Sequence, residues 1–314
     1  MRRQRLILIV VLIAACLLIP FMITNNYWMH IIIMTLIYMT LAASVDISYG
    51  YTGLLNLGQA AFYAIGAYAT ALLMLRLNMS FWVTIPISGV IAAIFGLLLG
   101  LPCLRVSGLY LCVVTMAFSE IVRIILLTWV SFTRGPMGLP GIPSPQLGGF
   151  VFKEPMEYYY LILGILVITL ISIHNLVNSR VGKAWMAIRD DEIAAKAMGI
   201  NPTYYKLISF AIGAFFAGIA GSFFAVYISF ISPDAFKFME SSMIFAMPAI
   251  GGPGTLLGPL FGAGLLYILP EVTREFAEYR MLWVGALLVI VMVIYPNGVV
   301  GAIKEAISKT KKIT

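Results

Sequence analysis

The stretch FWVTIPISGVIAAIFGLLLGL (Phe81–Leu101) runs for 21 residues without a charged side chain. A helix of about 20 apolar residues spans the hydrocarbon core of a bilayer, which is about 30 Å thick. Residues 241–270 are also apolar, but glycine and proline interrupt them. The runs together predict an all-α polytopic membrane protein. Comparable uninterrupted runs occur at Leu6–Thr24, Trp28–Val45, Gly58–Leu75, Leu109–Val130, Tyr158–Leu176, Leu207–Phe230 and Met281–Tyr295.

The composition supports this fold class and excludes others. Of the 314 residues, 61% are hydrophobic and only 11% are charged, and the mean hydropathy is +1.00. A soluble domain carries about a quarter of charged residues, so it could not cover this much apolar surface. The dyad alternation of a membrane β-barrel is absent from the sequence. We therefore expect residues 1–314 to form a single transmembrane domain.

Charge asymmetry predicts the orientation in the membrane, because Lys and Arg are enriched in cytoplasmic loops. With about ten membrane elements and the N-terminus inside, thirteen of the twenty Lys and Arg residues fall in inner segments and six in outer loops. Both termini are then cytoplasmic. The N-terminal run continues past Cys16, so it is interpreted as a first span and not as a signal peptide. The basic residues are dispersed, which argues against a nucleic-acid partner.

Two glycine-rich stretches interrupt apolar runs, one in each half of the chain. SYGYTGLLNLGQ (Ser48–Gln59) also brings two amide side chains to membrane depth, and GGPGTLLG (Gly251–Gly258) contains a proline that breaks a helix. Broken apolar segments in two halves point to a transport pathway. For Gly66, close helix packing on a small-residue face is the alternative. The candidate pathway residues are Gly50, Gly53, Asn56, Gly58, Gln59, Gly251, Gly252, Gly254 and Gly258.

Glu120 and Arg123 form a possible charge pair inside an apolar span. Residues three apart share a helix face, and a pair that faces the bundle interior is tolerable where a single charge is not. Three interpretations are open. The pair is a gate or a coupling contact, or it is a structural ion pair that locks helix packing, or its side chains reach the inner membrane interface. His30 and His174 stand alone, and no metal-ligand cluster, catalytic triad or phosphate-binding loop occurs. We expect no metal site and no enzyme activity.

Two polar segments interrupt the succession of spans. The outer loop 131–157 contains RGPMGLPGIPSPQLGG, which cannot be a continuous helix. It is either a passive linker or a contact surface for an external partner.

The cytoplasmic region 178–206 contains RDDEIAAKAMGIN (Arg189–Asn201), which is predicted to form one short amphipathic helix. Its acidic residues suit a first helical turn, and Gly199 ends the helix. An apolar stripe can form from Ile188, Ala195 and Met198, or from Ile193 and Ala197. The segment is either a solvated connector or a docking helix, and such a stripe with charges beside it favours docking.

Several segments of the sequence resemble those of a known family of membrane proteins. Ser179–Asn201 resembles the EAA-type loop of ABC importer permeases, with Glu192, Ala194, Ala195 and Gly199 at its characteristic positions. The order of five segments is similar to that of the branched-chain amino acid permease family, M-type subunit, over roughly residues 30–300. Gln59 departs from the family pattern, where His is expected in many members. The five segments are Gly50–Leu73, Arg105–Leu126, Arg134–Pro143, Ser179–Asn201 and Ala249–Leu266.

The resemblance implies a function and a set of partners. The chain would be a permease subunit of an ATP-driven importer of leucine, isoleucine and valine in a bacterial or archaeal cytoplasmic membrane. A homologous H-type permease, two ATPase subunits that bind ATP and Mg, and an external binding protein would be its partners, with no cofactor in this chain. Urea, short-chain amides or another amino acid are alternative substrates, and a stand-alone secondary transporter is the alternative class. The coupling residues would be Arg189, Asp190, Asp191, Glu192, Ala194, Ala195, Lys196 and Gly199.

Overall fold

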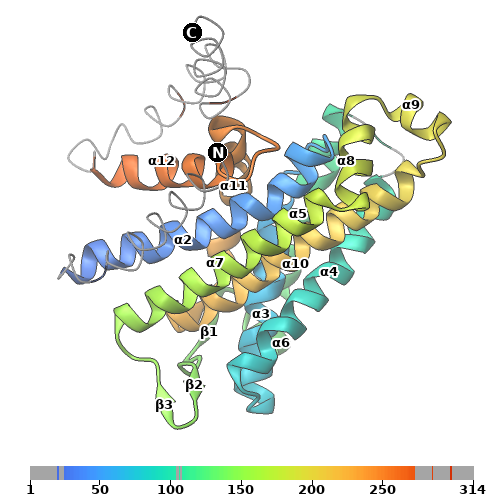
Figure 1. Ribbon diagram of the computed structural model, residues 1–314. Helices are drawn as coiled ribbons and strands as arrows, with labels where there is room; N and C mark the ends of the chain where they lie inside the picture. The colour runs from blue at the N-terminus through green and yellow to red at the C-terminus, as the bar shows by residue number, and fades with distance from the viewer. Residues whose placement is uncertain are drawn as a thin grey trace, which may run out of the picture.

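The computed structural model describes residues 20, 25–103, 106, 108–272, 285 and 298. Within them the fold is a bundle of long helices with short strands at one end (Figure 1). The long helices are α2 (Asn26–Asp46), α3 (Gln59–Leu77), α4 (Phe81–Cys103), α5 (Leu109–Thr128), α7 (Pro155–Asn178) and α10 (Pro202–Ile228). The shorter helices are α6 (Val130–Thr133), α8 (Arg180–Asp190), α9 (Glu192–Ala197), α11 (Phe238–Gly251) and α12 (Gly258–Val272). A π-helical turn, η1 (Ile47–Tyr51), follows α2, and η2 (Gly135–Met137) and η3 (Pro233–Phe236) are 3-10 turns.

Six helices of the described part are long and apolar enough to cross a membrane. They coincide with six of the predicted apolar runs, so the polytopic helical class is confirmed. Helix α10 begins at Pro202, before the predicted Leu207, because the Asn201 side chain caps it and proline suits the first helical position. The predicted spans Leu6–Thr24 and Met281–Tyr295 and both termini lie outside the described residues.

Helix α10 lies at the centre of the bundle and packs against α3, α4 and α2. Glycines permit this close approach. A Cβ atom at Gly66 of α3 would lie 2.2 Å from the carbonyl oxygen of Gly218 in α10, and one at Gly221 would lie 2.2 Å from the carbonyl oxygen of Tyr63. The small-residue interpretation of Gly66 therefore fits the structure, in which two backbones touch directly.

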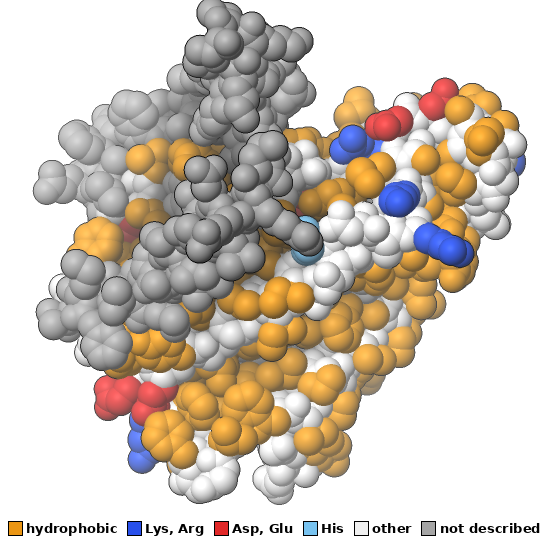
Figure 2. Space-filling model, viewed as in Figure 1, with side chains coloured by type: hydrophobic (Ala, Val, Ile, Leu, Met, Phe, Trp, Pro, Cys, Tyr) orange, Lys and Arg blue, Asp and Glu red, His pale blue; other side chains and the backbone are white. Residues whose placement is uncertain are grey.

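Charged and apolar side chains separate on the surface. In the view of Figure 2, hydrophobic side chains cover the middle of the molecule and charged side chains gather near its two ends. One charged end carries α8 and α9, and the opposite end carries the short strands. We call these the α8–α9 end and the strand end. This distribution suits a protein whose middle lies in lipid.

The predicted outer loop 131–157 contains several short ordered pieces. Strand β1 (Leu139–Pro140) pairs antiparallel with β4 (Phe230–Ile231), which follows α10. Strands β2 (Gln146–Leu147) and β3 (Phe150–Val151) form a hairpin. The loop is thus tied through a two-residue ladder to the segment between α10 and α11.

Candidate coupling and translocation sites

The coupling region folds as two helices, which corrects the prediction of one helix over Arg189–Asn201. Helix α8 ends at Asp190, and Asp191 adopts extended backbone, with φ −158° and ψ 110°. The Asp191 carboxylate then accepts hydrogen bonds from the amides of Ile193 and Ala194, at 2.9 and 3.0 Å. Asp191 is therefore an N-cap, because its side chain satisfies amide groups that a helix start leaves unpaired. Gly199 has a φ of +84° just after α9 and ends it, as the sequence predicts.

Two contacts hold α8 and α9 against the bundle. The Trp185 side chain of α8 is fully buried, and its indole nitrogen donates to the carbonyl of Tyr205 in α10, at 2.8 Å. The Lys206 ammonium of α10 donates to both carboxylate oxygens of Glu192, at 2.7 Å each. Both short helices are therefore bonded to α10.

Two large apolar side chains are exposed in α9 and directly after it. Ile193 is 82% exposed and Met198 is 83% exposed, whereas Ala195 is buried. Of the two possible apolar stripes, that of Ile188, Ala195 and Met198 is split, since Ile188 and Ala195 are buried and Met198 is exposed. The alternative stripe, Ile193 and Ala197, is exposed at both residues. Lys196 and Asp190 stand among the exposed side chains of this region. Single exposed apolar residues are common, but two on one short helix offer a contact surface.

Arg189 joins the coupling region to both glycine-rich segments. Its guanidinium donates a hydrogen bond to the carbonyl of Gly50, at 2.6 Å. A Cβ atom at Gly53 would lie 2.9 Å from the Arg189 side chain, and one at Gly254 would lie 2.8 Å from its guanidinium. Both glycines have positive φ, +77° and +70°, which other residues adopt at a cost. The structure thus brings Arg189, Gly50, Gly53 and Gly254 together. We call this contact between the end of α8 and the two glycine-rich segments the crossing.

The same crossing includes Asp46, which its position near the end of a span suggests is an interfacial residue or a partner for a cation. Asp46 is buried at the end of α2, and its carboxylate accepts from the amide of Gly254, at 3.1 and 3.2 Å. A Cβ atom at Gly50 would lie 2.0 Å from this carboxylate and 2.1 Å from the Gly254 nitrogen. No local sequence signal reveals the contact, because 208 residues separate its two partners.

A polar junction surrounds the start of α3. The Gln59 amide donates to the hydroxyl of Ser44 at 2.7 Å, and the Asn56 amide donates to the Gln59 oxygen at 3.3 Å. The backbone amide of Gly58 donates to the Asn56 side chain, at 2.9 Å. Ser241 of α11 accepts from the amide of Ala60, at 2.9 Å. These buried groups satisfy one another, which removes the cost of amides at membrane depth.

The second glycine-rich segment joins α11 to α12. A Cβ atom at Gly251 would lie 1.8 Å from the carbonyl oxygen of Gly258, and Gly252 has a φ of +122°. Glycine is required at these positions because the backbones of α11 and α12 touch. The break lets α11 end beside α2, at the crossing described above.

A cavity of about 280 Å³ opens beside this crossing. Residues 52–55, the beginning of α5 and residues 188–192 line it together with Lys206. The cavity separates the glycine-rich turn from the body of α5. Arg189, which donates to the carbonyl of Gly50, is itself part of the lining.

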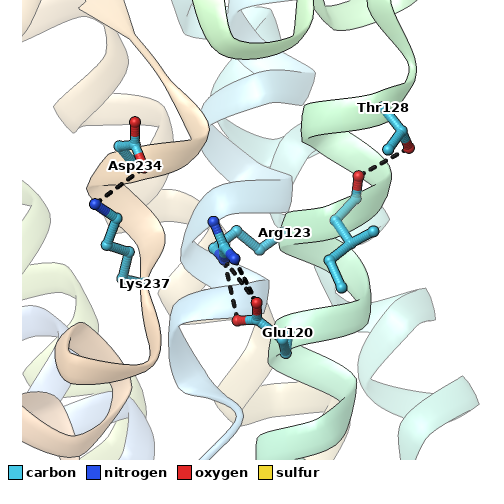
Figure 3. A network of polar contacts seen from close by, with 6 residues as sticks. Glu120, Arg123, Thr128, Asp234 and Lys237 are labelled. Atoms are coloured by element: carbon cyan, nitrogen blue, oxygen red, sulfur yellow. Dashed lines mark hydrogen bonds and ion pairs between the residues drawn. The ribbon is translucent and has the colours of Figure 1, made fainter.

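The predicted charge pair on α5 is formed, and both of its side chains are partly exposed. The Arg123 Nε donates to both carboxylate oxygens of Glu120, at 3.0 Å each. The Arg123 side chain is 21% exposed and that of Glu120 is 40% exposed. Figure 3 shows this pair on α5 beside a second pair, Asp234 and Lys237, whose charged atoms are 3.0 Å apart. Among the described residues, no group of His, Cys, Asp and Glu could hold a metal ion.

Helices of membrane length, broken segments that meet at a crossing and an exposed pair of short helices together define a class of protein. They are the parts of a transport permease, in which irregular backbone lies inside protein at membrane depth. Residues 27–295 match the family model described as branched-chain amino acid transport system / permease component. The chain belongs to this family.

Two relatives named as branched-chain amino acid permeases agree with this assignment. The high-affinity branched-chain amino acid transport system permease protein LivM of Escherichia coli K12 is 39% identical, over 94% of this chain and 75% of that protein. The LivH permease protein of the same strain is 25% identical, over 84% of this chain and 91% of that protein. The solved structure of PsaBC from Streptococcus pneumoniae in complex with Fab is 16% identical, over 87% of this chain and 94% of that chain, with a TM-score of 0.48. The chain is a permease for branched-chain amino acid transport.

Proposed function

We propose that this chain is the M-type half of a permease pair in an ATP-driven importer of leucine, isoleucine and valine. Two differently named permeases, LivM and LivH, are both similar to this chain. A homologous H-type chain is accordingly the second half. Two ATPase subunits bind ATP and Mg, and this chain needs no cofactor of its own.

In this proposal α8 and α9 are the docking site for an ATPase subunit. The exposed Ile193 and Met198 supply apolar contact, and the neighbouring charges orient the partner. The observation that carries the proposal is the 2.6 Å hydrogen bond from Arg189 to the carbonyl of Gly50. Through it, a shift of α8 moves the backbone of the broken segment, and ATP binding at the partner then changes the population of transport states.

The orientation follows from the same assignment. The α8–α9 end lies in the cytoplasm and the strand end faces outward, in the inner membrane of a bacterium or archaeon. The loop 131–157 then meets an external binding protein, which delivers the amino acid. Because β1 pairs with β4, such a contact reaches the segment that leads into α11.

The alternatives are less well supported. A stand-alone secondary transporter does not require an exposed pair of short helices at one end, and its function does not depend on ATP. Urea or short-chain amides would use the same architecture, but the family match and the relatives both name branched-chain amino acids. The experiment below separates these cases.

The test is uptake of radiolabelled leucine into proteoliposomes that hold this chain, its permease partner, the ATPases and the binding protein. Uptake is expected to require ATP and to fall sharply in Ile193→Asp, which places a charge on the α9 surface. The matched control Ile193→Leu keeps the surface apolar and is expected to transport normally. ATP-independent leucine transport by this chain alone would overturn the proposal, and urea uptake without leucine uptake would replace the substrate.

A further inference from the structure

Glu240 is an acidic residue at membrane depth that the sites above do not use. It lies in the first turn of α11 and is only partly exposed, and the next residue, Ser241, contacts Ser119 in the middle of α5. Its carboxylate accepts a hydrogen bond from the Tyr38 hydroxyl of α2. The ion pairs between described residues do not include Glu240. An acid placed in a membrane bundle without a cationic partner indicates a functional site.

Tyrosines from three helices surround this carboxylate. The ring of Tyr267 in α12 stacks on that of Tyr38, with centroids 4.7 Å apart. Helix α3 reaches the same place, because the amide of Ala60 donates to Ser241, the residue after Glu240, and Tyr63 lies one turn further along α3. The rings of Phe236 and Tyr63 meet edge to face at 5.1 Å and close the side of the cluster. The carboxylate therefore lies among aromatic rings and hydroxyls.

Two of the hydroxyls at this place have no protein partner. Tyr63 is 1% exposed and Tyr68 is 3% exposed, and neither hydroxyl bonds to another group among the described residues. A buried hydroxyl without a hydrogen bond costs about 1–3 kcal/mol. Native proteins rarely keep such groups without a reason. The unpaired Tyr63 hydroxyl beside Glu240 is a second, independent sign that a polar ligand belongs here.

The chemistry of the cluster selects a cation. A carboxylate repels anions and attracts an ammonium group, to which it bonds strongly. Tyrosine faces stabilise the same charge through cation–π contact. An ammonium has three donors, so it can bond to the Glu240 carboxylate and to a hydroxyl oxygen at once. A branched-chain amino acid carries both such an ammonium and an apolar side chain.

We propose that Glu240, with Tyr38, Tyr63 and Tyr267, forms a transient subsite for the ammonium group of the transported amino acid. The inference rests on the proposed import function. The Tyr38 hydroxyl holds the carboxylate in the present conformation and yields to the substrate. The 14 residues of α11 separate this subsite from the Gly254 crossing by about 20 Å. The substrate thus meets the subsite first when it enters from the strand end.

The binding test uses the full-length chain in detergent and three probes at millimolar concentration: leucine, 3-methylbutylamine and 4-methylpentanoate. The second probe is leucine without its carboxylate, and the third is leucine without its amine. Because a ligand stabilises the state that it binds, leucine and the amine are expected to raise the Tm by about 2 °C, and the acid is not. Glu240→Gln is expected to abolish both shifts. Equal shifts with the acid, or shifts that persist in Glu240→Gln, would overturn the subsite.

Two further variants keep the test decisive if Glu240→Gln folds poorly. Tyr63→Phe removes a hydroxyl that has no protein partner, so a structural role predicts no loss of Tm without ligand, whereas the subsite predicts a smaller shift with the amine. Asp234→Asn removes an exposed acid in η3, shortly before α11 and outside the cluster. It is expected to keep the Tm shifts with leucine and with the amine. Normal shifts in Tyr63→Phe, or lost shifts in Asp234→Asn, contradict the proposal.

Transport separates the subsite from the wider function. In proteoliposomes, Glu240→Gln is expected to lower the leucine moved per ATP hydrolysed while ATP hydrolysis itself continues. An unchanged ratio would refute the subsite and leave the importer assignment standing. If the wild-type chain shows no ATP-dependent uptake but the amine still raises its Tm, the importer assignment fails and the ammonium site survives.

Discussion

The replacement of Arg189 by methionine tests the link between the coupling region and the broken segments. Methionine keeps most of the aliphatic stem but removes the guanidinium that donates to Gly50 at 2.6 Å. A hydrogen bond from a charged donor contributes about 1.5–3 kcal/mol. The Arg189 side chain is 39% exposed, and water partly replaces the contact, so the lower end of that range applies. About 1.4 kcal/mol corresponds to a tenfold change in an equilibrium.

Arg189→Met is therefore expected to lower the leucine transported per ATP by up to about tenfold. Basal ATP hydrolysis should persist, because the substitution leaves the exposed surface of α9 intact. The assay measures uptake and phosphate release in the same proteoliposomes. Arg180→Met removes an exposed arginine at the other end of α8 and serves as the matched control. Arg189→Lys, with a shorter reach and one donor centre, should fall between the two.

A normal ratio of leucine transported to ATP hydrolysed in Arg189→Met would refute the reasoning, since the bond to Gly50 would then carry no coupling. A proportional loss of uptake and ATP hydrolysis would also refute it, because that result indicates lost assembly. A low ratio in Arg180→Met would show that the charge of α8 matters and that the specific contact does not.

Other consequences follow from single contacts. Asp191→Ala removes the cap of α9 and should cost about 1 kcal/mol, seen as faster proteolysis at the α8–α9 junction in detergent. Gly66→Ala places a Cβ atom 2.2 Å from the Gly218 carbonyl and should sharply lower the folded yield, whereas Gly164→Ala, with open space around it, should express normally. Gln59→Leu leaves the buried Asn56 amide nitrogen without its partner and removes the bond to Ser44, so Tm should fall in keeping with about 1–3 kcal/mol.

The spans were predictable because a bilayer imposes a length and an apolar composition on each of them. The run at Phe81–Leu101 has no competing interpretation, and α4 covers it. The glycine-rich breaks were visible for a similar reason, since several glycines and a proline exclude a regular helix. The family resemblance rested on the order of these local signals, and the family match confirms it.

The contacts that join the breaks were not predictable from the sequence. Asp46 looked like an interfacial residue, because nothing near it in the sequence indicates Gly254 as its partner. Glu240 directly precedes the interrupted apolar residues 241–270, and its tyrosine partner comes from α2. The prediction of a single coupling helix was wrong for a local reason. Three acidic residues suit a first turn, but aspartate also suits an N-cap, and Asp191 takes that role.

Helix α10 has a mechanical consequence beyond its place in the core. Its 27 residues form a rod of about 40 Å. At one end Lys206 forms an ion pair with Glu192, and just past the other end β4 pairs with β1. A tilt of about 5° about one end would displace the other by about 3.5 Å over that length. A small rotation of α10 about the α8–α9 end would therefore move the strand end by more than the length of a hydrogen bond.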